Sequence, residues 1–150
     1  MSDSANTQFT QEELLSLAQG NATAFVLAAF AYLKARDLDP DEYVAFFARW
    51  VAPGWEELRG RPVTDVAREA ALNVVSVGGT LRSLSGDDTS AEVLIAGWPG
   101  EDLLSELQMT QSDGDRLWNA FKPIMEYLGL RYACQREGEA VRMTFEIESP

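Results

Sequence analysis

Hydrophobic residues in the first half of the chain recur every three to four positions, a spacing that predicts amphipathic helices. Thr10, with Glu13 three positions later, forms a capping box before a helix that we expect to end at Gly20. Asn21 is the expected N-cap of a second helix over residues 22–36, which is apolar nearly all round. A helix without a polar face must be buried on several sides, inside the domain or in a dimer.

Two further helices are expected before the pattern changes. The helix over 40–52 opens with an Asp-Pro pair, typical of a helix start, and carries a stripe of aromatic side chains. A Pro-Gly step then interrupts it, and Trp55 begins a short extension. The next helix is expected over 63–77, which makes the first half a run of four helices.

The second half alternates between strand and helix patterns. Residues 80–85 and 90–97 are expected to form a hairpin around SGDD, followed by helices over 100–108 and 112–128. A second hairpin turns at Glu137-Gly138-Glu139. Its last strand alternates, with one apolar face made of Val141, Met143, Phe145 and Ile147.

This order predicts an α+β fold: N-terminal helices, then ββααββ, with a four-stranded antiparallel sheet covered by helices on one face. Residues 9–150 are expected to be a single domain, because 150 residues are enough for one well-buried core. Residues 1–8 are polar and are expected to be a disordered tail.

Charge and composition narrow the classes of function. The chain carries 24 acidic and 12 basic side chains, and a net charge of −12 repels phosphate backbones, so we expect no nucleic acid partner. The N-terminus has no signal-peptide pattern, and the longest uncharged run, 20–33, is shorter than the ~20 residues that span a bilayer. A single cysteine fits a reducing compartment. We expect a cytoplasmic protein that does not bind membranes.

The chain contains no histidine, which removes catalytic triads, histidine-ligated zinc, histidine-ligated haem and a histidine general base. One thiol cannot form a structural zinc site, so we expect neither a metal nor a cofactor. Gly78-Gly79 ends a helix rather than beginning one, so it is no phosphate loop.

Cys134 admits two interpretations. As a nucleophile or redox group it needs a pKa lowered by a cation, and Arg131, Arg136 and Arg142 are the candidates. As a structural residue it is a small buried apolar side chain on the same strand face as Tyr132, which is the commoner role of a free cysteine.

Paired carboxylates occur at Asp113 with Asp115 and at Asp87 with Asp88, and neither pair fits a calcium loop. Helix capping and turn formation explain both pairs, so a catalytic carboxylate is the less favoured interpretation.

The aromatic side chains are the remaining candidates for a binding site. Trp55 and Trp98 each lie beside a Pro-Gly break, where an indole can sit at the edge of a cleft with its N–H free. Core packing or a dimer interface is the commoner use of such tryptophans, and a cleft between these two residues is where we expect a binding site if the chain has one. Other aromatics that could line a pocket are Tyr43, Phe46, Phe47, Trp50, Trp118, Tyr127 and Tyr132. The candidate ligand-binding residues are Trp55, Trp98, Trp118, Tyr132 and Cys134.

From residue 63 to 148 the order of elements resembles the 4-vinyl reductase domain and the related aminothiazoline-carboxylate hydrolase-like proteins. The likeness rests on a helix entering a hairpin, two further helices, the Gly129-Leu130 step and a final strand containing TFEI. It implies a small-molecule sensor module or an enzyme, often dimeric. Those proteins carry further cysteines, whereas this chain has none between Met143 and Phe145, so their thiol or metal chemistry is not implied.

Taken together, the sequence predicts a non-catalytic module that binds a small apolar or aromatic ligand and forms a homodimer. Two alternatives stay open. One is a hydrolase-like enzyme that uses Cys134 or a carboxylate, and the other is a protein–protein interaction adaptor with an exposed apolar face.

Overall fold

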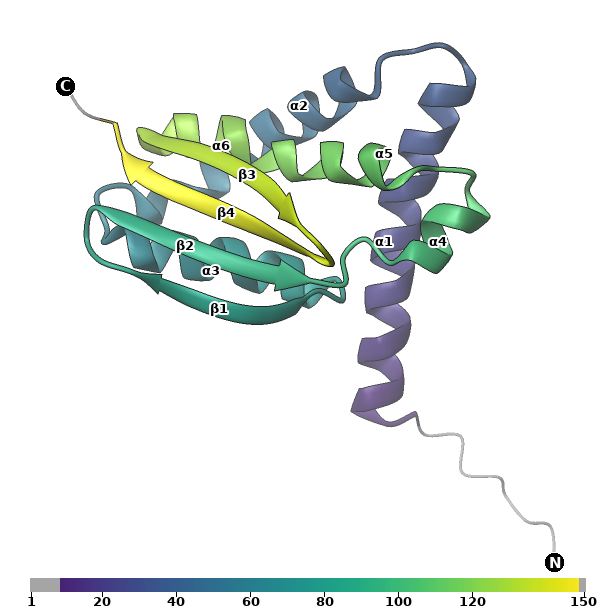
Figure 1. Cartoon of the computed structure of the whole chain (residues 1–150), viewed down its shortest axis with the longest axis horizontal. Helices are drawn as coiled ribbons and strands as arrows, with labels where there is room; N and C mark the ends of the chain where they lie inside the picture. Colours follow the sequence, from purple (N-terminus) through teal and green to yellow (C-terminus); the bar gives the residue numbers. More distant parts are fainter. Residues whose placement is uncertain (1–8, 149–150) are drawn as a thin grey trace, which may run out of the picture.

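The computed structural model describes residues 9–148 and contains helices followed by a four-stranded antiparallel sheet, as predicted (Figure 1). In chain order the elements are α1 (Gln11–Ala35), α2 (Pro40–Val51), the 3-10 helix η1 (Ala52–Leu58), α3 (Val63–Ser76), β1 (Thr80–Gly86), β2 (Ser90–Ala96), α4 (Glu101–Glu106), α5 (Gln111–Asp115), the 3-10 helix η2 (Arg116–Ala120), α6 (Phe121–Leu128), β3 (Leu130–Glu137) and β4 (Ala140–Ile147). The expected disordered tail, residues 1–8, lies outside the described residues.

The sheet has the strand order β1-β2-β4-β3, so β2 and β4 are central and join the two hairpins. The inner side chains of the central strands, Val93, Ile95, Met143 and Phe145, are at most 1% exposed. The opposite face carries ion pairs, including Arg142 with Glu92 at 3.0 Å. This alternation of buried apolar and exposed polar positions is the one expected of a sheet with one solvent-facing side.

Helices cover one face of the sheet in two layers. Helices α3 and α6 pack directly on the strands, which confirms the predicted arrangement. Helix α2 packs against α6 and η2, and α1 crosses the end of the inner layer, so these two helices form an outer layer (Figure 1). Two apolar clusters result, one between sheet and inner helices and one beneath α1 and α2, and Trp98 contacts both.

The two helices predicted over residues 11–20 and 22–36 are one continuous helix, so that prediction is wrong. The Thr10–Glu13 capping box is present as expected, but Gly20 does not end the helix and Asn21 does not begin another. A Cβ on Gly20 would meet nothing within 4 Å, so glycine is not needed there for space. A glycine within a helix costs only about 1 kcal/mol, and the apolar residues on both sides propagate the helix through it.

The helix predicted over 112–128 is divided into α5, η2 and α6. Pro123 explains the last division, because it lacks the backbone N–H that would bond to the carbonyl of Asn119. Helix α6 therefore begins at Phe121, and Gly129 ends it in the left-handed conformation, as predicted. Ile147, expected on the buried face of β4, is 48% exposed because it lies at the end of its strand.

The expectation that helix 22–36 is buried on several sides is not met within a single chain. In α1 only Thr23, Leu27 and Phe30 are buried, whereas Phe25 is 78% exposed and Tyr32 is 57% exposed. The aromatic stripe of α2 is likewise exposed, with Phe46 at 64% and Trp50 at 72%. The sequence pattern indicated that these residues must be covered, and the chain does not cover them itself.

Helix α1 is also long and apolar enough, by length and composition alone, to cross a membrane, and only 17% of its most apolar window is buried. A helix that packs against a protein partner passes the same test, so this property does not distinguish the two environments. The expectation of no membrane association stays a prediction.

Candidate functional site

An apolar cavity of about 260 Å³ lies between the outer helices and the inner helical layer. Every helix of the two layers contributes a wall: α1 and α2 on one side, α3 and α6 on the other, with η1, η2 and the loop after β2 at the ends. The lining residues are Val26, Tyr43, Val44, Phe47, Val51, Trp55, Asn73, Val74, Val77, Trp98, Leu117, Ala120, Phe121 and Ile124.

The cavity is lined by Trp55 and Trp98, the two tryptophans predicted to lie at the edges of one cleft. Trp55 lies on η1 and Trp98 in the loop between β2 and α4, so the fold brings together two Pro-Gly breaks far apart in the chain. Trp55 packs edge to face against Phe121, with ring centroids 6.2 Å apart. The two breaks therefore supply aromatic walls to one space.

Trp98 is fixed by a short chain of hydrogen bonds that links three elements. Its indole Nε1 donates to Oγ1 of Thr23 on α1, at 3.1 Å, and this hydroxyl donates to the carbonyl of Val77, at 2.8 Å. Thr23 is only 6% exposed, so both partners depend on it for a hydrogen bond. The N–H of Trp98 is thus engaged in the fold and is not free for a ligand.

The chemistry of this lining suits an apolar molecule. Asn73 is the only carboxamide and no charged side chain takes part. A dry cavity of 150 Å³ lined by aliphatic and aromatic groups takes up benzene, and this one is larger. Its size fits one or two aromatic rings or a short aliphatic group, below the usual range for drug-sized ligands.

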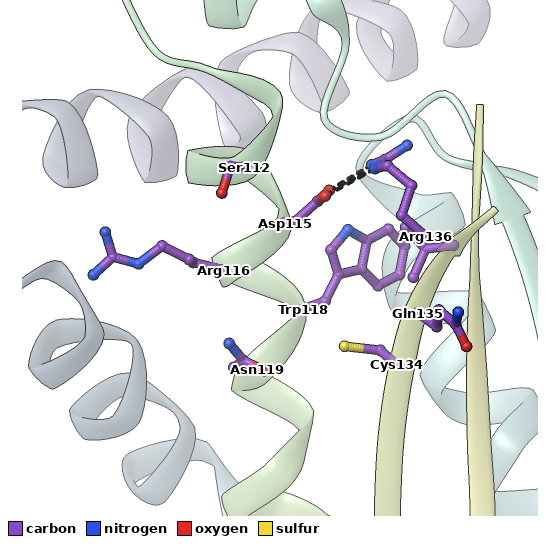
Figure 2. Close-up of a pocket in the computed structure, with 9 residues that line it drawn as sticks. Ser112, Asp115, Arg116, Trp118, Asn119, Cys134, Gln135 and Arg136 are labelled. Carbon is purple, nitrogen blue, oxygen red and sulfur yellow. Dashed lines mark hydrogen bonds and ion pairs between the residues drawn. The ribbon is translucent and has the colours of Figure 1, made fainter. Parts of the chain in front are cut away.

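Trp118 and Cys134 border a different, polar cavity of about 320 Å³ (Figure 2). One wall is η2 with the end of α5, and the other is β3. Figure 2 shows Asp115 facing Arg136 across the opening, and Asp115 Oδ1 lies 2.6 Å from Arg136 Nη2. This ion pair neutralises both groups, so the cavity presents no unpaired charge from them.

Cys134 is half-buried and its thiol is held in the protonated form. Burial raises its pKa, the neighbouring Tyr132 hydroxyl lowers it by less, and the negative charge of Asp115 raises it further. The cation that a nucleophile would need is Arg136, but Asp115 binds it. The geometry therefore favours the structural interpretation of Cys134, on the same strand face as Tyr132 as expected.

Trp118 and Tyr132 act as core residues. Trp118 is 1% exposed and packs edge to face against Trp98, with centroids 5.4 Å apart. Tyr132 lines neither cavity. Its hydroxyl donates to the carbonyl of Trp118, at 3.0 Å, and burial raises its pKa well above the ordinary value. Among the described residues, the indole N–H of Trp118 has no acceptor.

The paired carboxylates have structural roles, as expected. Asp113 completes a capping box with Thr110 and accepts a hydrogen bond from Lys34 Nζ at 2.6 Å. Burial raises the pKa of Asp113, but Lys34 and Thr110 outweigh it and leave the pKa below its usual value. Asp87 accepts hydrogen bonds from Thr89 and Ser90 within the first hairpin turn.

Of the five candidate site residues, then, two line the apolar cavity, two line the polar cavity, and Tyr132 lines neither. The aromatics Tyr43 and Phe47, considered as pocket residues from sequence, also line the apolar cavity. Its aliphatic residues, such as Val74 and Ile124, were not singled out, because apolar residues of α3 and α6 are equally suited to plain core.

Among residues 9–148, no cluster of three or more cysteine and carboxylate side chains could hold a metal ion. No protein-family model matches the chain, and no curated protein matches it either. The resemblance to the 4-vinyl reductase domain stays a prediction.

Proposed function

We propose that the chain is a binding module for a small apolar or aromatic molecule, which it holds in the cavity between Trp55 and Trp98. The observation that carries the proposal is the 260 Å³ space with an almost wholly apolar lining, at the junction of the two helical layers. Apolar concave sites with a few polar groups are where small molecules bind in most proteins.

The cavity is also placed where a ligand would affect the rest of the chain. Its walls come from both helical layers, so filling it adds contacts between α1–α2 and α3–α6. Trp98 also packs against Trp118, and Trp118 lines the polar cavity. A ligand that stabilises the packing of the layers is what a sensor module requires.

The hydrolase-like alternative finds less support. A thiol nucleophile needs a lowered pKa, whereas that of Cys134 is raised. The aspartates that might replace it already serve as a helix cap, a turn and an ion-pair partner.

A second property is proposed on a separate observation. Large apolar side chains on α1 and α2 are exposed, and a charged monomer of this size rarely leaves so many uncovered. We propose that the module is a homodimer that covers part of this surface. An adaptor for another protein would use the same surface, so the oligomeric state separates the two.

The ligand proposal is tested with 1-aminonaphthalene, a neutral two-ring fluorophore whose emission moves to shorter wavelength in apolar surroundings. We expect saturable binding to the wild type with a Kd of about 1–100 µM, given the usual efficiency of small ligands. Ala120→Phe projects a ring into the cavity from η2 and is expected to abolish binding.

Ala133→Phe is the matched control, because Ala133 is exposed on the open face of β3 and the same ring is added there. Circular dichroism establishes that both variants are folded. Equal binding by the two variants, or no saturable binding by the wild type, would contradict the ligand proposal.

A further inference from the structure

Helix α1 has one face that packs on the rest of the chain and another face that points away from it. Its inner face is occupied by contacts with α3 and α5, through Gln19, Thr23 and Lys34. The opposite face repeats at intervals of three and four, and its residues are Leu15, Ala18, Ala22, Phe25, Ala29 and Tyr32. Apolar residues at this spacing are typical of the contact face between two paired helices, and we call these six residues the seam.

Four of the six seam residues are exposed in the chain by itself, and the other two, Ala22 and Ala29, are half-buried. Leu15 is 58% exposed, Phe25 78% and Tyr32 57%. Figure 1 shows the N-terminal end of α1 extending beyond the sheet and the other helices, and every residue from 11 to 18 is exposed. At 1.5 Å per residue, the 25-residue helix is roughly 37 Å long, and the seam from Leu15 to Tyr32 covers about 26 Å of it.

The order of large and small residues matches an antiparallel copy of the same helix. A two-fold axis between Thr23 and Ala24 places Phe25 opposite Ala22 of the second copy, so a ring meets a methyl group. It also brings Ala18 opposite Ala29, which allows close approach, and Leu15 opposite Tyr32 at the ends. An isologous dimer requires such self-complementarity.

The charges at the ends of α1 favour the same arrangement. Glu12 lies in the first turn, and Arg36 caps the last turn with its guanidinium 5.1 Å from the centroid of the Tyr32 ring. Within the part of the chain that the structure describes, neither residue takes part in an ion pair. An antiparallel copy brings Glu12 beside Arg36 at both ends of the seam, whereas a parallel copy would place like charges together.

We propose that α1 is the homodimer interface. Two copies pair antiparallel through the seam, about a two-fold axis that lies midway along the seam at the height of Thr23 and Ala24, with Glu12–Arg36 ion pairs at both ends. The inference rests on the proposed dimer and deepens it by naming the surface, and it does not depend on a ligand in the cavity. A net charge of −12 per chain opposes association in general, so the uncharged seam with complementary ends is the surface that overcomes it.

Sedimentation velocity of the full chain across protein concentration tests the surface. We expect a dimer for the wild type and for Phe46→Glu, whose phenyl group is 64% exposed on α2. Phe25→Glu places two carboxylates near the two-fold axis and is expected to raise the dimer Kd by about 100-fold or more. If Phe46→Glu dissociates the dimer and Phe25→Glu does not, the chain still dimerises, but α1 is not the interface.

Charge reversal tests the orientation. Glu12→Arg and Arg36→Glu are each expected to weaken the dimer by about tenfold, from two exposed pairs turned repulsive, and the double variant is expected to restore it. Failure of the double variant to restore dimerisation would contradict the Glu12–Arg36 pairs.

Disulfide trapping in a Cys134→Ala background gives a second measurement of orientation. We expect Ala18→Cys and Ala29→Cys to cross-link when mixed and not when alone, because each lies opposite the other. Cross-linking of either variant alone would show a parallel or different seam. A wild type that stays monomeric and co-sediments with phosphatidylcholine vesicles would place α1 in a membrane and overturn the inference.

Discussion

The sheet with its inner helices and the outer surface of α1 and α2 differ in how their apolar residues are used. Between the sheet and α3 and α6, the largest side chains are completely buried, including Phe145 and Met143. On α1 and α2, residues of the same kind, including Phe25 and Trp50, are mostly exposed. The chain itself buries the apolar side chains of the first region, whereas those of the second are buried only if another molecule binds there.

This contrast shows that hydrophobic pattern alone does not tell where a residue is buried. The alternation in β4 and the all-round apolar pattern in α1 both predict burial, but only the first is satisfied within one chain. An apolar helix that stays exposed marks an interaction surface, because the hydrophobic effect favours covering it. The cavity lies at the junction of the two regions.

The largest expected difference is between two phenylalanines. Phe145→Ala removes a ring that is 0% exposed in the core and is expected to lower the free energy of unfolding by about 3–5 kcal/mol. Phe25→Ala is expected to change it by less than about 0.5 kcal/mol in the dissociated chain. Urea unfolding at protein concentrations below the dimer Kd measures both. Comparable losses would mean that Phe25 is buried within one chain.

The hydroxyl that joins the two regions has the next largest expected effect. Thr23→Val keeps the shape of the side chain but leaves the Trp98 N–H and the Val77 carbonyl without a partner, which is expected to cost about 1–3 kcal/mol. Thr144→Val on the open face of the sheet is the matched control, and we expect it to cost less than about 0.5 kcal/mol. Equal losses of unfolding free energy for the two variants would show that the hydrogen bonds of Thr23 with Trp98 and Val77 do not stabilise the fold.

The ion pair between α1 and α5 gives a pH-dependent comparison. Because the pKa of Asp113 is lower in the folded chain, its contribution is complete above the unfolded pKa of about 3.9 and is lost as the pH falls through the folded pKa. Asp113→Asn is expected to cost about 1 kcal/mol at pH 7, since Lys34 is partly exposed, and progressively less as the pH falls through the folded pKa of Asp113.

Unfolding measured at several pH values gives the profile, with Asp102→Asn on the exposed face of α4 as the control. A cost for Asp113→Asn that does not change with pH would mean that the carboxylate acts only as a neutral cap.

The smallest expected effect concerns Cys134. Burial and the charge of Asp115 raise its pKa, so we expect iodoacetamide to label the folded protein at pH 7 more slowly than free cysteine. The urea-unfolded protein is expected to label at the rate of free cysteine. Faster labelling of the folded chain would restore the thiol-enzyme alternative.

Much of the fold follows from local patterns that a sequence displays. The capping box at Thr10, the Asp39-Pro40 helix start, both hairpins and the alternation in β4 are all present in the structure. Each depends on residues close in the chain. The continuity of α1 through Gly20 was missed because a glycine after an apolar run suits both a helix end and an uncrowded helix interior.

The candidate site was predicted in part for the same reason. The Pro-Gly steps beside Trp55 and Trp98 mark breaks in the chain, and these indoles do line one cavity. Trp118 and Cys134, predicted to belong to the same site, line the separate polar cavity between η2 and β3. Which face of η2 meets α2 and which meets the sheet depends on tertiary packing, and no local pattern in the sequence specifies it.

Native mass spectrometry with added 1-aminonaphthalene tests the ligand site and the dimer in one experiment. The chain has a mass of 16.6 kDa, and we expect a species of twice that mass that takes up one probe molecule per chain and releases it on denaturation. Ala120→Phe is expected to give the same dimer without the probe. A wild-type monomer that takes up no probe would contradict both the ligand site and the dimer.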